Sequence, residues 1–143
     1  MSVKTRRRAR ALLVKALYQW QLAGHGYDEL LAQYSTLAEF DRIDQDYFRG
    51  LLRYVLDDVE ALDRVIAAFA VRKLDQLDAV GRAVLLIALA ELKHRADVPT
   101  KVVINEAVEL AKKFGATASF KFVNAVLDKA AKELRGQDDR RAG

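Results

Sequence analysis

The stretch "AVLLIALAEL", residues 83–92, is the most apolar part of the sequence. It is apolar nearly all round a helical wheel, which predicts a helix over about residues 78–94 that lies inside the molecule. Its longest uninterrupted apolar run has eight residues, 83–90, whereas a membrane span needs roughly 20. We therefore expect a globular fold built around this segment.

Helical patterns continue on both sides of that segment. Apolar residues spaced by three and four predict further helices over about residues 4–23, 28–34, 45–71, 99–114 and 118–135. Gly24 and Gly115 fit helix ends, Pro99 fits a first helical position, and Thr117 fits an N-cap. No stretch alternates for long as a strand does. The prediction is an all-α single domain over residues 1–136, followed by a polar and disordered tail at 137–143.

Charge is distributed unevenly along the 143 residues, although the net charge is only +4. Residues 1–27 carry six basic side chains and no acid, residues 28–80 carry twelve acids against six bases, and the remainder carries twelve bases against eight acids. Basic ends around an acidic middle suggest a polyanionic partner. The absence of cysteine excludes disulfides and thiolate chemistry. No signal peptide pattern precedes the first helix, so we expect a cytoplasmic protein.

The last predicted helix contains two phenylalanines that cannot share a face. On a wheel, Phe120 falls in the apolar stripe, and Phe122 falls outside it beside Lys129, with Lys121 further round. Phe122 is either a packing residue covered by another helix or a platform on which an unpaired base stacks. Lysines beside it would contact the phosphates.

The first predicted helix repeats this combination of basic and aromatic side chains. Arg6, Arg10 and Gln21 lie along one flank of its apolar stripe, and Arg7 and Tyr18 lie further round on nearly one line. A solvated basic terminus or a sorting signal would also explain the arginines. Two helices that each pair basic residues with an aromatic ring outside the stripe favour single-stranded RNA as the partner.

Three motifs together resemble the NusB family of bacterial transcription antitermination factors. They are "RRRARALLVKALYQWQL" at residues 6–22, "VPTKVVINEAVELAKKFG" at 98–115 and "KFVNAVLDKAAKELR" at 121–135. The resemblance implies a fold of about seven helices in two packed halves. It also implies binding of single-stranded boxA RNA from ribosomal RNA leaders, together with the small-subunit ribosomal protein that acts as NusE. The complex then supports read-through by RNA polymerase.

The resemblance and the wheel analysis assign the RNA contacts to the first helix and the start of the last one. The residues expected to bind RNA are Lys4, Arg6, Arg7, Arg8, Arg10, Tyr18, Gln21, Lys121, Phe122, Asn124 and Lys129. The chain departs from the family pattern at Gly81, Leu86, Ala118 and Phe120, and no partner-binding residue is assigned. A homodimer with the first helix in its interface is left open and would hide the basic residues.

No pattern of catalytic residues is present. His25 and His94 are far apart in the sequence, and there is no phosphate-binding glycine loop or nucleophile motif. We therefore expect no enzyme activity, no cofactor and no metal site. Two alternatives stay open: an RNA-binding fragment of a ribosomal RNA cytosine methyltransferase, and an adaptor that binds only proteins.

Overall fold

The computed structural model describes residues 2–70, 77–116 and 120–142, and within these ranges the chain is helical with no strand. The elements are α1 (Val3–Ala23), α2 (Tyr27–Tyr34), the 3-10 helix η1 (Ala38–Arg42), α3 (Gln45–Phe69), α4 (Ala79–His94), α5 (Thr100–Lys113) and α6 (Phe120–Ala142). The predicted all-α fold is confirmed, with the short η1 as the seventh helical element.

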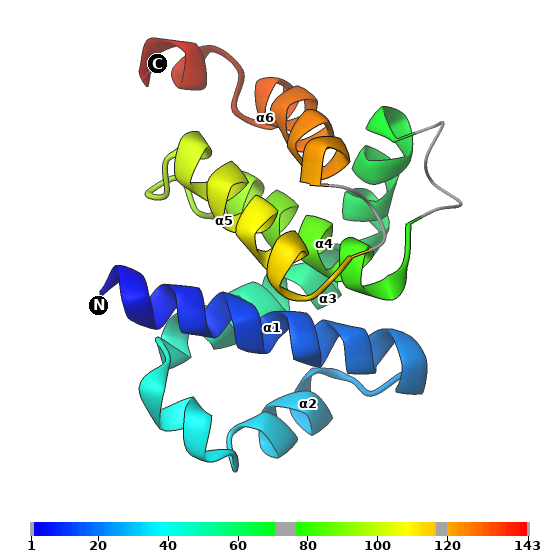
Figure 1. Ribbon diagram of the computed structural model, residues 1–143, viewed down its shortest axis with the longest axis vertical. Helices are drawn as coiled ribbons and strands as arrows, with labels where there is room; N and C mark the ends of the chain where they lie inside the picture. The colour runs from blue at the N-terminus through cyan, green and yellow to red at the C-terminus, as the bar shows by residue number, and fades with distance from the viewer. Residues whose placement is uncertain (1, 71–76, 117–119, 143) are drawn as a thin grey trace.

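Helix α4 is the centre of the fold, as its apolar sequence predicts. Every residue from 83 to 90 is at most 2% exposed, and α4 packs against α1, α3, α5 and α6. The elements α1 to α3 form one half of the molecule and α4 to α6 the other, with α5 lying between α1 and α6 in the view of Figure 1. Because both halves bury their apolar faces on the same helix, they share one core.

Local sequence signals fix the helix ends. Asp44 caps α3 by accepting a hydrogen bond from the Tyr47 amide, and Asp78 caps α4 in the same way through the Gly81 amide. Gly24 ends α1 in the left-handed region with φ 74°. Pro99 is the N-cap of α5 rather than its first residue, because its carbonyl already accepts the first helical hydrogen bond, from Val103.

Two expectations concern the start and the end of α6. The predicted N-cap Thr117 lies outside the described residues. At the other end Gly136 has φ 52° and ψ −128° and interrupts the helical geometry, at the position predicted as the boundary between domain and tail. The disorder predicted for residues 137–143 stays a prediction.

Arg135 joins α6 to the turn between α4 and α5. All five of its N–H groups have partners at 2.6–3.1 Å, namely the backbone carbonyls of Glu91, Leu92, Arg95 and Val98 and the Thr100 hydroxyl. These carbonyls belong to the end of α4 and to the segment after it, where a helix leaves carbonyls with unused acceptor capacity; those of Glu91 and Arg95 also accept a backbone N–H, from Arg95 and Val98. A single guanidinium therefore caps one helix from another.

Candidate nucleic-acid interface

The outward face of α1 combines basic side chains with an aromatic ring. Lys4, Arg7, Arg8 and Tyr18 are all exposed, and Tyr18 retains 42% of its surface. Their spacing places them on one side of the helix, with Arg7 and Tyr18 nearly in line and about 16 Å apart along the axis. We call these four residues the α1 surface. It can offer both cations and a ring to one ligand.

Two other predicted residues of α1 bond to the rest of the protein. Arg10 is only 3% exposed, and its guanidinium forms two-pronged hydrogen bonds of 2.9–3.1 Å to the Glu91 carboxylate. Gln21 donates to the Ala79 carbonyl at 2.8 Å and accepts from Arg82. The polar groups of Arg10 and Gln21 thus already bond to protein, and direct contact of these two residues with RNA stays a prediction.

Arg6 is half-buried between two carboxylates. Its guanidinium lies 3.6 Å from Asp44 and 3.4 Å from Asp97 and sits over the Tyr47 ring, 4.4 Å from the ring centroid. It therefore joins α1 to the start of α3 and to the turn before α5, and it presents less charge to solvent than Arg7 or Arg8.

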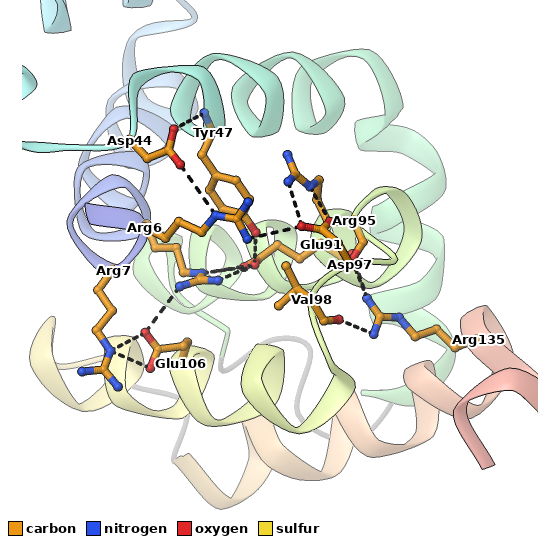
Figure 2. A network of polar contacts seen from close by, with 11 residues as sticks. Arg6, Arg7, Asp44, Tyr47, Glu91, Arg95, Asp97, Val98, Glu106 and Arg135 are labelled. Carbon is orange, nitrogen blue, oxygen red and sulfur yellow. Dashed lines mark hydrogen bonds and ion pairs between the residues drawn. The ribbon is translucent and has the colours of Figure 1, made fainter. Parts of the chain in front are cut away.

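Beneath the α1 surface lies a network of buried charges, drawn in Figure 2. Glu91 accepts hydrogen bonds from Arg10 and from the Tyr47 hydroxyl. Burial raises the pKa of Tyr47 and the charge of Glu91 raises it further. Burial is the largest single influence on the pKa of Arg10 and lowers it, but the hydrogen bonds to Glu91 and the charges of neighbouring acidic groups together outweigh burial and leave the pKa raised. Arg10 is thus held as a charged guanidinium.

Glu106 of α5 connects this network to the α1 surface. Its carboxylate accepts from the Arg7 Nε at 2.9 and 3.1 Å and lies 3.4 Å from an Arg10 terminal nitrogen. Figure 2 shows Arg7 and Glu106 together at one end of the network. The Arg7 side chain is still 64% exposed, and its terminal nitrogens have no partner among the described residues. Glu106 therefore fixes the direction in which Arg7 presents them.

On α6 the two phenylalanines differ in exposure, and one of them departs from its predicted position. Phe120 is 44% exposed with the Lys112 ammonium 4.7 Å from its ring centroid, whereas Phe122 is half-buried and packs against the core. Phe120 is exposed despite its angle because it stands at the first residue of α6, where a wheel carries no information about position along the axis. The assignment of Phe120 to the core is wrong.

The polar residues predicted on α6 lie on its outer face. Lys121, Asn124 and Lys129 are exposed, and the Asn124 amide donates to Asp128 at 3.2 Å. Asn124 also borders an open groove of about 960 Å³ between α5 and α6. These residues stand on a different helix from the α1 surface, and one ligand would have to cross α5 to reach both.

Neither a metal-ligand cluster nor a membrane-spanning helix is found in the described ranges. They contain no group of three or more His, Cys, Asp or Glu side chains that could hold a metal ion. His25 bonds to Gln19, and His94 stacks on Tyr54 with ring centroids 4.3 Å apart. None of the helices searched there is long and apolar enough to cross a bilayer.

Comparison with known proteins agrees with this arrangement. A model described as the NusB family matches residues 7–132. The chain belongs to the NusB family. Among curated relatives, the Transcription antitermination protein NusB of Sodalis glossinidius is 49% identical over 94% of this chain and 97% of its own. That of Alcanivorax borkumensis is 48% identical over 91% and 87%. A solved structure of T. maritima NusB superposes with a TM-score of 0.80 at 32% identity, covering 97% of this chain and 99% of that one.

Membership of the NusB family bears on the function of the helices that carry the site. The family is one of transcription antitermination proteins rather than of enzymes, and the matched residues include most of α1 and most of α6. Sequence reasoning alone missed Glu91 and Glu106. A signal for Glu91 was present, since a carboxylate inside an apolar helix needs a buried partner. Nothing comparable marks Glu106, which looks like any polar residue of an amphipathic helix.

Proposed function

We propose that this chain is a transcription antitermination factor of the bacterial cytoplasm. It binds single-stranded boxA RNA of ribosomal RNA leaders together with the ribosomal protein that acts as NusE. The resulting complex supports read-through by RNA polymerase. The chain acts by assembly, not by catalysis.

The observation that supports this most directly is the α1 surface. Lys4, Arg7 and Arg8 can neutralise phosphates, while Tyr18 offers a ring on which an unpaired base can stack. A duplex reader inserts a helix into a groove and rarely needs such a ring. Lys121, Phe122, Asn124 and Lys129 extend the proposed contacts to α6.

Arg6, Arg10 and Gln21 support the interface from within. Arg10 holds Glu91, and both Arg10 and Arg7 hold Glu106, so the burial of one arginine helps to orient the exposed one. In this proposal they position the RNA-binding residues instead of contacting RNA.

Fluorescence anisotropy of a short boxA-like RNA across a salt series tests the proposal, with the ribosomal partner absent and present. Tyr18→Ala and Phe122→Ala should each weaken binding by about 1–3 kcal/mol with the salt slope unchanged, because each removes a base contact. Arg8→Ala should weaken binding and reduce the slope by about 0.7, because it removes a phosphate contact.

The outcomes separate the candidate functions. Absence of RNA binding by the wild-type protein, even with the ribosomal partner, would favour the adaptor that binds only proteins. Light scattering on the same samples, for the wild type and for Tyr18→Ala, reports whether the protein is a homodimer and whether dimerisation depends on α1. An RNA-bound dimer that needs Tyr18 to dimerise would contradict RNA binding through the α1 surface.

A further inference from the structure

A small cavity lies between the start of α1 and the start of α5. Its volume is about 340 Å³, near the lower end of the range for small-molecule sites. Val98, Pro99 and Val102 supply apolar lining from the α5 side, and Arg6 and Arg7 supply cations from the α1 side. The cavity thus has an apolar wall and a basic edge.

The polar groups around the cavity include one that has no partner. Asn105 of α5 lines it and is exposed, and its carboxamide makes no hydrogen bond to any described residue. A carboxamide offers donors and an acceptor in one plane, which suits recognition of a planar polar edge. By contrast, Asp97 and Glu106, which also line the cavity, are paired with arginines.

The charges around the cavity indicate which part of a nucleotide would enter it. The charged groups of the lining already pair with one another or with neighbours: Arg6 with Asp97, Arg7 with Glu106 and Arg10 with Glu91. Among the described residues, no unpaired cation therefore lies inside the cavity to hold a phosphate. The terminal nitrogens of Arg7 are instead available at the edge, in the direction that Glu106 fixes. A phosphate is therefore favoured outside the cavity on Arg7, and an uncharged ring is favoured inside it.

We propose that this cavity binds one unpaired nucleobase of the RNA, an inference that rests on the proposed function. The base lies against Val98, Pro99 and Val102, its polar edge meets the Asn105 carboxamide, and its phosphate lies on Arg7. The site lies beside the α1 surface and extends it across to α5. It adds base readout at the end of α1 that lacks an aromatic ring.

Abasic scanning of the RNA tests this assignment. Each nucleotide of the boxA-like RNA is replaced in turn by an abasic one, and binding is measured for the wild type and for Asn105→Ala. Asn105→Ala should weaken binding of intact RNA roughly 5- to 30-fold with the salt slope unchanged. At one RNA position the abasic substitution and Asn105→Ala should be non-additive, because both remove the same contact.

Gln33→Ala is the matched control, since it removes an exposed carboxamide from α2 at the far side of α1. It should bind every RNA as the wild type does. Two outcomes would leave RNA binding in place but show that the cavity assignment is wrong. In the first, Arg8→Ala weakens RNA binding and Asn105→Ala does not. In the second, the loss of affinity caused by Asn105→Ala adds to the loss caused by the abasic substitution at every RNA position. If the wild type binds no RNA even with the ribosomal partner, both the proposed function and this inference fail.

Discussion

Glu91 shows how a single residue can determine the arrangement beneath a surface. It is 1% exposed in the most apolar helix of the chain, where an unpaired carboxylate would be very costly. Arg10 and Tyr47 satisfy it from α1 and α3. The contacts of Glu91 therefore specify how α1, α3 and α4 meet. Glu106, which bonds to both Arg10 and Arg7, links this buried arrangement to the orientation of Arg7.

Breaking this pair should destabilise the fold strongly. Glu91→Gln leaves the buried Arg10 guanidinium with only Glu106, 3.4 Å away and shared with Arg7, as its counter-charge. We therefore expect the free energy of unfolding to fall by about 3 kcal/mol in urea titrations, the lower end of the range for breaking a buried pair. The double variant Arg10→Met with Glu91→Leu removes both charges and should recover most of the loss. An unchanged urea midpoint for Glu91→Gln would show that the pair does not stabilise the fold.

Asp97 gives a pH dependence whose sign can be derived. Hydrogen bonds from Arg95 lower the pKa of the Asp97 carboxyl to about 2, whereas an aspartate in an unfolded chain titrates near pH 3.9. Its contribution to the free energy of unfolding is therefore complete above about pH 4 and is lost as pH falls to about 2. Because the side chain is 53% exposed, the contribution is below about 1 kcal/mol.

Thermal unfolding of Asp97→Asn between pH 5 and pH 2 checks this expectation. The variant should lose less stability on acidification than the wild type does, and the two should differ most above pH 4. Parallel curves over the whole range would show that Asp97 has no lowered pKa in the folded protein.

At the scale of elements, the sequence predicts which segments are helices far better than which residues are exposed. The spacing in α1 and α3 and the apolar run in α4 identify the helices, because periodicity follows from backbone geometry alone. The roles of Phe120 and Phe122 depend instead on where α6 begins relative to α5. The burial of Arg10 depends on Glu91, a residue 81 positions away, and no local pattern encodes such a distance.

The contact between Arg135 of α6 and the end of α4 also joins residues that are distant in the sequence, and it can be tested. Arg135→Ala removes five hydrogen bonds at once, so we expect a loss of about 2–3 kcal/mol in unfolding free energy. Amide exchange should accelerate first in the last turn of α4 and in residues 95–98. Arg135→Lys keeps the charge but not the planar set of donors, and it should resemble Arg135→Ala; full stability of the lysine variant would mean that charge alone suffices.

For the whole molecule, the shared helix α4 makes the two halves interdependent. Helix α4 packs against α1 and α3 of one half and against α5 and α6 of the other, so neither half keeps a closed core without it. The sequence indicates this through the all-round apolarity of residues 83–92. It cannot indicate the order of packing around α4, since the amphipathic stripes of α1, α3, α5 and α6 are alike in period.

The interdependence predicts a single cooperative unfolding transition. Trp20 is the only tryptophan, and it packs against the core in α1 with the Arg82 guanidinium 5.1 Å from its ring. Its fluorescence therefore reports on the half formed by α1 to α3, while far-UV circular dichroism reports on all helices. Because both halves depend on α4, the two signals should give the same urea midpoint and the same slope. A fluorescence midpoint distinct from that of the dichroism would mean that the halves unfold separately, and the buried Arg10–Glu91 pair would then break before the rest of the core.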